Sequence, residues 1–329
     1  MIMKKITLTK SAAPVAFCAG LCLAGGALSA QAQVTPEQKS LLKEFFANRA
    51  ETAIILSGSD SIGGGNFTVE SDRNDDIEFS LLKLGGSGLL GDPRPMGDTG
   101  VKWSPYLRGV VGYASADNEI KFGTLAGNDL EETTFAVQFG GGVTFWMTDR
   151  LRVTPSVGVL YGYYETELDD STPAGTAAAP ILDLELQTLG ATPGIELAYA
   201  IPAGKITFDL STKYTLYATG DISDDDKSNG VEADGTTHVW ENKVDVDIPL
   251  GVEVFNCQLH TGGFVGHTAL FGDVTDSLAT DNFFTIHPRI VANTEGKLWK
   301  VSRLGLGASY YAGEDFSGWD IGVEVNFKF

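Results

Sequence analysis

The chain ends on the stretch WDIGVEVNFKF, Trp319 to Phe329, which alternates strictly between apolar and polar residues. Successive side chains of an extended strand point to opposite faces, so the apolar residues share one face and the polar residues share the other. The apolar face carries Trp319, Ile321, Val323, Val325, Phe327 and Phe329. Such a strand packs its apolar face against a protein core or against lipid, and the rest of the sequence decides between them.

Residues 1–32 have the three parts of an export signal. Lys4, Lys5 and Lys10 form a positive region, an apolar stretch follows from Pro14 to Leu28, and Ala30-Gln31-Ala32 matches an A-x-A cleavage site. We therefore expect the mature chain to begin near Gln33, outside the cytoplasm.

Charge and cysteine content narrow the class of protein further. The chain has 23 basic and 43 acidic residues, a net charge of −20, which argues against a nucleic-acid partner. Cys257 is the single cysteine outside the predicted signal, so no disulfide within the mature chain is expected. The mature sequence also has no run of about 18 apolar residues, as a transmembrane helix requires.

The alternation of the last strand recurs along the chain and predicts about twelve long strands. Strands of ten or more residues are long for a soluble sheet but suit a tilted crossing of a bilayer, and an even strand number suits a bacterial barrel. The predicted strands are 66–72, 76–84, 104–115, 133–147, 151–167, 182–201, 205–219, 238–255, 257–272, 283–294, 301–312 and 319–329.

The predicted connections alternate between tight turns and long acidic loops, as periplasmic turns and external loops do. The long loops are expected around 117–132, 168–181, 220–237 and 273–282. Segment 85–103 is longer than a turn should be, and the change of apolar phase near Gly190 suggests a β-bulge.

The polar faces of these strands carry many charges, which would be costly in a dry core but suit a wet barrel interior. The sequence therefore predicts an all-β fold: a transmembrane, antiparallel, up-and-down β-barrel over 66–329. The residues expected to line the lumen are Asp209, Lys213, Asp245, Asp247, Glu253, His287, Arg289, Arg303 and Glu324.

Residues 33–65 should form one helix and a Gly/Ser-rich hinge. Thr35-Pro36-Glu37-Gln38 resembles a capping box, and helix formers continue to about Leu56. Twelve tilted strands leave a lumen roughly 12 Å wide, close to the 10–12 Å width of a helix. We expect this helix to plug the lumen along its depth, with Arg49 near Asp209, Asp245, Asp247 and Glu253. A helix lying against the periplasmic rim remains the alternative.

Two stretches carry a resemblance to a known family. Ile54-Ile55-Leu56-Ser57-Gly58-Ser59-Asp60 runs into Gly63-Gly64-Gly65-Asn66-Phe67, and the chain closes on Val323 to Phe329. With the helix and the barrel, they resemble the solitary outer-membrane autotransporter β-barrel domain family. The resemblance implies a translocator-type barrel in the outer membrane with a helix in its pore, and about 30 residues before the barrel leave no room for a passenger domain.

The same resemblance implies partners but no enzyme. Phe327 and Phe329 match the C-terminal aromatic signal read by the barrel assembly machinery, and outer-membrane lipid and lipopolysaccharide should surround the wall. We expect no catalytic residue, cofactor or metal site. The acidic loop Asp221–Gly230 lacks the residue order of an EF-hand, so a solvated external loop is the better interpretation.

Two other functions remain open at this stage. An open small-solute porin would have its helix outside the lumen. An outer-membrane hydrolase would need a nucleophile beside one of the four histidines, His238, His260, His267 and His287. We expect His260 and His267 on opposite faces of one strand and His287 in the lumen. The expected function is a plugged or low-conductance pore.

These expectations make one prediction about location. The mature protein should fractionate with outer membranes, and it should migrate faster on a denaturing gel before heating than after, because a closed barrel resists the detergent. Recovery of the protein in the soluble periplasmic fraction would contradict the barrel.

Overall fold

The computed structural model describes residues 36–328 apart from short stretches. The segments outside the description are 1–35, 60–62, 70–76, 121–126, 169–171, 173–175, 177, 180–181, 279, 299–300 and 329. The predicted export signal, the Thr35 cap and Phe329 therefore lie outside the described residues. So does much of the predicted loop 168–181.

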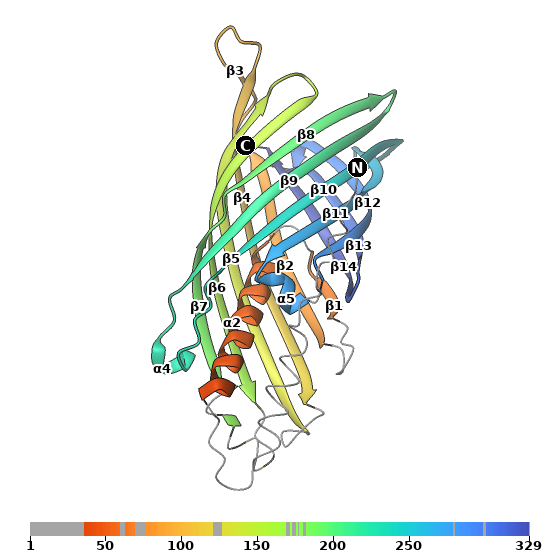
Figure 1. Cartoon of the computed structure of the whole chain (residues 1–329). Helices are drawn as coiled ribbons and strands as arrows, with labels where there is room; N and C mark the ends of the chain where they lie inside the picture. Colours follow the sequence, from red (N-terminus) through yellow and green to blue (C-terminus); the bar gives the residue numbers. More distant parts are fainter. Residues whose placement is uncertain are drawn as a thin grey trace, which may run out of the picture.

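The described chain forms one closed antiparallel barrel whose wall has twelve strands, as predicted. Each wall strand pairs with the next along the chain, and β1 and β2 both meet β14 to close the circle. Figure 1 shows the strands tilted around a common axis. The wall consists of β1 (Gly65–Val69), β2 (Ile77–Leu89), β4 (Lys102–Ile120), β5 (Asn128–Trp146), β6 (Leu151–Leu168), β7 (Leu184–Ala191) with β8 (Gly194–Ala203), β9 (Ile206–Asp221), β10 (Gly235–Val254), β11 (Cys257–Gly272), β12 (Asn282–Leu298), β13 (Val301–Gly313) and β14 (Phe316–Lys328).

β7 and β8 together form one wall strand, which is interrupted at Thr192-Pro193. Both halves pair with β6 on one side and β9 on the other. Proline cannot donate to the ladder, so the strand breaks there, and the amide of Thr192 instead donates to Gly158 O at 2.8 Å. The irregularity predicted near Gly190 is therefore present two residues further on.

The junction of β1, β2 and β14 differs from the prediction. β1 is shorter than the predicted 66–72 and covers part of the barrel height, while β2 continues to Leu89 beyond the predicted 76–84. On the periplasmic side of Gly65, where β1 begins, strand β14 pairs directly with β2. This pairing is parallel and joins Asn326–Lys328 with Ser87–Leu89. Between the two pairings a pocket of about 360 Å³ opens in the wall beside Leu82 and Val323.

The long segment 85–103 forms an arm that projects from one end of the barrel (Figure 1). β2 extends through its first residues, and the two-residue strand β3 (Arg94–Pro95) pairs with the beginning of β4. The connection is therefore a hairpin that extends beyond the wall, not a loop that covers it.

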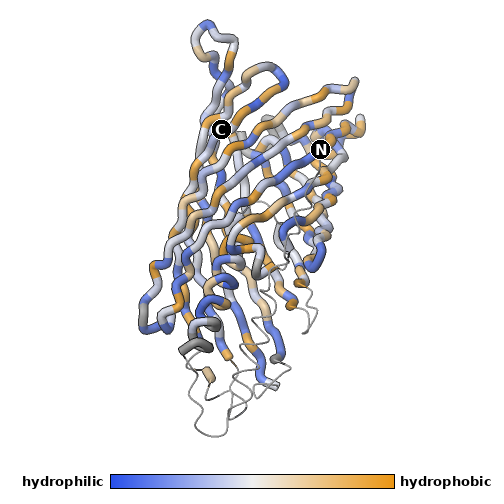
Figure 2. Tube along the Cα trace, viewed as in Figure 1, coloured by the Kyte–Doolittle hydropathy of each residue, from blue (hydrophilic) through white to orange (hydrophobic). Residues whose placement is uncertain are grey.

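The wall alternates between outward apolar and inward small or polar residues, and Figure 2 shows this alternation along most strands. Large aromatic side chains mark one border of the outward apolar band: Tyr113, Phe135 and Tyr163 are successive register partners on β4, β5 and β6. Tyr214 with Trp240 and Tyr310 with Trp319 continue this girdle. Ten residues along β6, tilted by about 40°, span about 26 Å, which matches the apolar band of outer-membrane barrels.

The connections identify the two ends of the barrel. Tight turns at 147–150 and 255–256 lie at the end where β14 finishes, which is the periplasmic end of such barrels. The opposite, external end carries the longer connections, including the short helices α4 (Asp225–Ser228) and α5 (Val274–Leu278). The loop predicted at 117–132 is shorter than expected, because β4 continues to Ile120 and β5 already begins at Asn128.

The two faces of β6 give a direct test of the alternation. Val157 points outward near the middle of the apolar band and is 60% exposed, whereas its neighbour Ser156 points into the lumen. Val157→Lys should lower the free energy of unfolding by about 2–4 kcal/mol, because it places a charge in hydrocarbon. Ser156→Lys should cost little. Equal losses in urea titrations of the two variants in lipid would contradict this orientation.

Candidate functional site

The helix α2 (Pro36–Gly58) runs from the external mouth into the barrel (Figure 1). It packs on the inner faces of β4, β5 and β6 and on α5. Every residue from Ala50 to Gly58 except Ala53 is buried, and so is Phe46 one turn earlier. A helix whose second half is buried on all sides against the inner face of the wall lies in the lumen, so the alternative of a helix on the periplasmic rim is wrong.

Two glycines of the wall make room for the helix. A Cβ added to Gly162 of β6 would overlap the side chain of Ile54, and one added to Gly112 of β4 would overlap the backbone of Ser57. From the helix side, a Cβ on Gly58 would overlap Leu160. Contacts this close leave no layer of water between α2 and this part of the wall.

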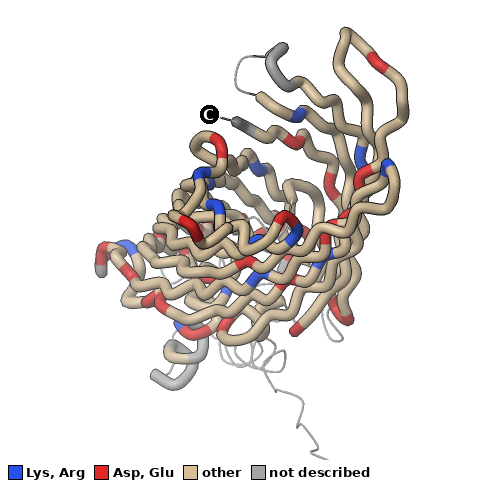
Figure 3. Tube along the Cα trace, turned by 90° about the horizontal axis from the view of Figure 1, so that it is seen from above, with Lys and Arg blue, Asp and Glu red and all other residues tan. Residues whose placement is uncertain are grey.

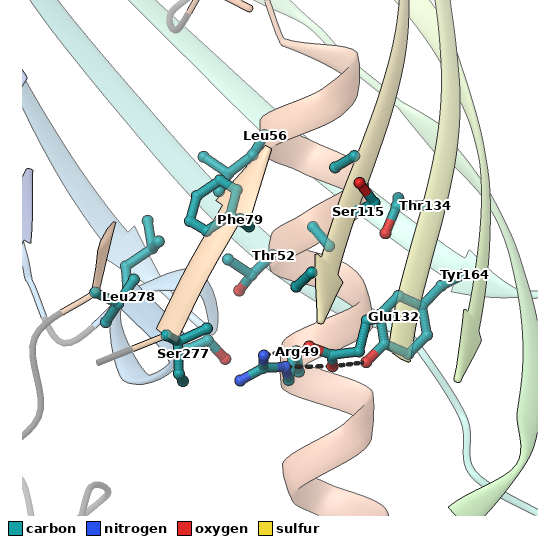
Figure 4. Close-up of a pocket in the computed structure, with 15 residues that line it drawn as sticks. Arg49, Thr52, Leu56, Phe79, Ser115, Glu132, Thr134, Tyr164, Ser277 and Leu278 are labelled. Carbon is teal, nitrogen blue, oxygen red and sulfur yellow. Dashed lines mark hydrogen bonds and ion pairs between the residues drawn. The ribbon is translucent and has the colours of Figure 1, made fainter. Parts of the chain in front are cut away.

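Arg49 fastens the helix to the wall at the external end. Its guanidinium donates two hydrogen bonds to the carboxylate of Glu132 on β5, and the hydroxyl of Tyr164 on β6 donates to the same carboxylate (Figure 4). All three side chains lie beyond the aromatic girdle, toward the outside. Burial opposes the charge, but Glu132 and Tyr164 hold the pKa of Arg49 above its ordinary value, so Arg49 stays charged at all physiological pH values.

The external connections hold the other sides of the helix. Lys43 Nζ donates to Gly230 O at 2.7 Å, immediately after α4. Glu51 accepts a hydrogen bond of 3.1 Å from the Thr237 hydroxyl at the start of β10. Val274 and Leu278 of α5 belong to the same apolar cluster as the helix. The mouth is thus closed around α2 by contributions from several strands and loops.

A small pocket remains between the helix and the wall near Arg49. Its volume is about 70 Å³, and its apolar part is formed by Leu56, Phe79 and Leu278 (Figure 4). A pocket of this size holds a few water molecules.

The helix fills only the external half of the lumen, which corrects the prediction that it spans the barrel depth. Its last residue, Gly58, lies against Ala136 and Leu160 at mid-height of β5 and β6. Just beyond the helix end, Arg108 and Gln138 reach across the wall to Thr192 at the break between β7 and β8. Arg108 is 3% exposed, so the lumen is densely filled on this side as well.

Several of the predicted lumenal charges form ion pairs in the periplasmic half, two with one another and one with Arg152, which was not among the predicted residues. Arg152 reaches Asp209 at 2.8 Å, Arg289 reaches Asp245 at 2.7 Å, and Arg303 reaches Asp247 at 2.8 Å. We call these three pairs the lumen ladder. Asp209 and Asp245 are directly opposite on β9 and β10, a repulsive arrangement that the two arginines offset. Figure 3 shows basic and acidic residues interspersed around the wall.

The prediction for the partners of Arg49 is wrong. Arg49 binds Glu132, and Asp209, Asp245 and Asp247 are engaged by the lumen ladder. Glu253 does not reach the helix either, because it lies exposed at the periplasmic end of β10, past the bulge that follows Pro249. Both errors come from the depth assigned to the helix, which stops before it reaches these rows.

Lys213 belongs to a separate group. Its Nζ lies 3.4 Å from the carboxylate of Glu241, which also forms an ion pair with Lys243 at 2.8 Å.

Phe327 lies in β14 opposite Val301, at the periplasmic end of the wall. Its side chain is outside the described part of the structure.

His287 joins two neighbours in a hydrogen-bonded chain across β12, β13 and β14. Its Nδ1 lies 2.8 Å from Ser309 Oγ, and its Nε2 lies 2.7 Å from Glu324 Oε1. The ring stacks on Phe264 with centroids 4.8 Å apart, and Gly307 leaves it the space to lie flat. His260 faces the same lumen and meets Asp247 at 3.0 Å.

A serine, a histidine and a carboxylate in line are the elements of a nucleophilic site, but a catalyst also needs donors for the developing oxyanion. The amide of Ser309, the nearest natural donor, is already donated to Asp320 at 3.0 Å. Ser309 is also only 6% exposed. This chain therefore resembles a structural hydrogen-bond network more than a hydrolytic centre.

Among the described residues, no helix is both long and apolar enough to cross a membrane. No group of three or more His, Cys, Asp or Glu in the described ranges could hold a metal ion.

Comparison with known proteins defines the class to which this fold and plugged lumen belong. Residues 94–326 match the model of the solitary outer membrane autotransporter beta-barrel domain. Because the match covers more than two thirds of the chain, the protein belongs to this family, and it is an integral β-barrel of the outer membrane. The match begins at Arg94, so α2, β1 and β2 lie outside it. None of the curated proteins matches the sequence.

Solved autotransporter barrels share the fold. The transport unit of the autotransporter AIDA-I from Escherichia coli superposes with a TM-score of 0.59 at 10% identity, over 86% of this chain and 99% of that one. The beta domain of the Bordetella autotransporter Brka gives a TM-score of 0.51 at 16% identity, over 80% and 98% of the two chains. At these identities the likeness concerns the fold alone.

The contact between Gly162 and Ile54 can be tested by paired substitutions. Gly162→Ala should displace the helix end, because its Cβ would overlap Ile54, and hydrogen exchange of the α2 amides should accelerate. Adding Ile54→Ala should restore much of the protection, since it removes the overlapping atoms.

Gly322→Ala is the matched control, because this glycine has open space beside it. It should leave exchange of α2 unchanged. Equal effects of Gly162→Ala and Gly322→Ala would show that α2 does not rest on β6.

Proposed function

We propose that this protein is a translocator-type pore that is closed in its resting state by α2. The single observation that carries the proposal is the burial of the helix within the external half of the barrel. Three further observations agree with a plug that is held in place. The wall has glycines where the helix contacts it, the ion pair of Arg49 with Glu132 fastens the helix, and the external connections pack around it. The channel would conduct weakly until the helix leaves.

The direction of the helix supports this function. Its first turn lies at the external mouth and its last turn at mid-barrel, so the chain passes down the lumen before it joins the wall at β1. A helix that threads the barrel in this direction presents its first turn, at Pro36, to the external mouth. This is the arrangement expected when a polypeptide has crossed through the pore.

The lumen below the helix is suited to polar passage. The lumen ladder presents charges of both signs, and Arg289 has a glycine as register partner on either side, Gly262 on β11 and Gly307 on β13. A wet passage of mixed charge accepts a hydrated ion or an extended polypeptide without strong selection by charge. We infer that the ladder keeps this passage wide while it satisfies the charges.

The surroundings of the barrel follow from the same assignment. The outward apolar band is covered by outer-membrane lipid. We propose that the external acidic connections face lipopolysaccharide, and that β14, with Phe327 near its end, is the strand that the barrel assembly machinery recognises.

Two alternatives are less well supported. An open porin requires a lumen free of α2, whereas the helix is packed against three wall strands. A hydrolase would use Ser309 and His287, whose environment lacks the oxyanion donor described above. Hydrolysis of a lipid ester by the purified barrel, abolished by His287→Ala, would be required to adopt that function.

Deletion of α2 is the direct test of the plug. A variant without residues 36–58 should show single-channel conductance several-fold above that of the intact protein in planar bilayers, while its heat-modifiable migration shows that the barrel is folded. An intact protein that conducts as well as the deletion variant would contradict the plug.

Arg49→Met tests how the plug is held. It leaves Glu132 buried without its cation, which typically costs about 3–5 kcal/mol, so brief openings should become frequent. Adding Glu132→Gln should reduce the openings by removing the unpaired charge. Arg150→Met, at the exposed turn after β5, is the control and should behave like the wild type.

A further inference from the structure

Glu51 is a buried acid at the interface between the helix and the external mouth. Glu51 is 1% exposed. It lies within one turn of Arg49 on the same helix. Its Oε1 accepts from the Thr237 hydroxyl at 3.1 Å. The hydrogen-bond partner of Glu51 is therefore a neutral hydroxyl. Arg49, in contrast, has a partner of opposite charge, the carboxylate of Glu132.

A second carboxylate meets Glu51 at this position. A Cβ added to Gly235 would overlap the carboxylate of Glu51 and would lie 2.7 Å from Asp273 Oδ2, so the two acids converge on one point of the backbone. Asp273 is fixed there by the amide of Thr236, which donates to Oδ2 at 2.9 Å. Only a glycine at position 235 lets both carboxylates approach.

The described charged groups that face Glu51 are all acidic. Asp273 comes from the turn before α5, and Asp234 comes from the connection before β10. The two cations of the same helix whose side chains are described are engaged elsewhere, Lys43 by Gly230 O and Arg49 by Glu132. α5 contributes the apolar Val274 and Leu278 to this contact.

Burial, and next the charge of Asp273, raise the pKa of Glu51 to about 7 from an ordinary value of 4.5. Asp234 adds to the rise, and the hydrogen bond from Thr237 opposes it. At a pH below this value the docked helix carries a neutral Glu51. Above it, two or three carboxylates repel one another in a site that excludes water.

We infer that Glu51 is a pH-sensitive latch, which holds α2 in the barrel when it is protonated and favours release of the helix when it is ionised. This inference rests on the proposed function, because it concerns what keeps the plug seated. It adds a signal that would open the pore, a rise in pH at the outer surface of the cell.

The direction follows from proton linkage. The docked helix binds a proton more tightly than the released helix does, so docking is strongest below the pKa of the released form and weakens as pH rises through that of the docked form. Between the pKa of the released form and that of the docked form, the equilibrium constant for docking should fall by up to roughly 300-fold. This factor corresponds to the full difference between the two pKa values. Exposure of the site to solvent would make the change smaller.

Conductance of three full-length proteins in planar bilayers tests the latch. The open probability of the wild type should rise at least about tenfold between about pH 5 and about pH 8.5. Glu51→Gln, which cannot ionise, should remain closed throughout this range. Glu44→Gln removes an exposed acid from the same helix and should follow the wild type.

A fourth variant tests the role of Asp273. Asp273→Asn removes the like charge but keeps an oxygen for the Thr236 amide, so ionisation of Glu51 becomes easier. The pKa of docked Glu51 should then lie closer to its ordinary value, so the rise in open probability between about pH 5 and about pH 8.5 should be smaller than in the wild type. A rise as large as that of the wild type would contradict the latch.

The deletion of residues 36–58 separates the two proposals. If it conducts no better than the intact protein, the plug itself is wrong. If it conducts several-fold better but wild type and Glu51→Gln respond to pH alike, the plug stands and the latch is overturned. Heat-modifiable migration of every variant confirms that the barrel has folded.

Discussion

The structure depends on one constraint: within hydrocarbon, each backbone donor and acceptor must find its partner in the protein. A single sheet meets this condition only by closing on itself. The closed wall has lipid on one face and the lumen on the other, so apolar and polar side chains alternate along each strand. The same constraint explains why strands as different as β6 and β14 share one pattern. It is least well met at the junction of β1, β2 and β14, where β1 is too short and a pocket interrupts the wall.

A closed wall of this circumference leaves a lumen about as wide as one helix, and the side chains of the wall decide whether a helix fits. Glycines do this here. Gly112 and Gly162 clear the path of α2, Gly235 admits two carboxylates at the mouth, and Gly307 lets His287 lie flat. The high glycine content of the chain thus serves the lumen as much as it serves the curvature of the strands.

Charge is distributed by the same logic. The protein is strongly acidic, yet Arg108, Arg289 and Arg303 point inward. Carboxylates of other strands pair with Arg289 and Arg303, and the carbonyl of Thr192 accepts a hydrogen bond from Arg108. Two acids with different surroundings lie at the mouth: Glu132 of the wall, which is paired with Arg49, and Glu51 of the helix, which lies beside Asp273. The first contact fastens the helix to the wall, and the second makes its docking depend on pH. The docking of α2 is therefore stabilised by the attraction between Arg49 and Glu132, and its release is favoured by the repulsion between Glu51 and Asp273.

The class of fold was readable from the primary structure, because a period of two over ten or more residues, as in Trp319–Phe329, is a local property. The lumenal face of Asp209, Asp245 and Arg289 followed from the same period. The depth of the helix and the partner of Arg49 did not follow, because both depend on how strands distant in sequence come together around α2. Glu132 lay in a segment assigned to a loop, and nothing local distinguishes Gly162 from other strand glycines. Only the closed barrel brings Arg49, Glu132 and Tyr164 together and sets Glu51 beside Asp273.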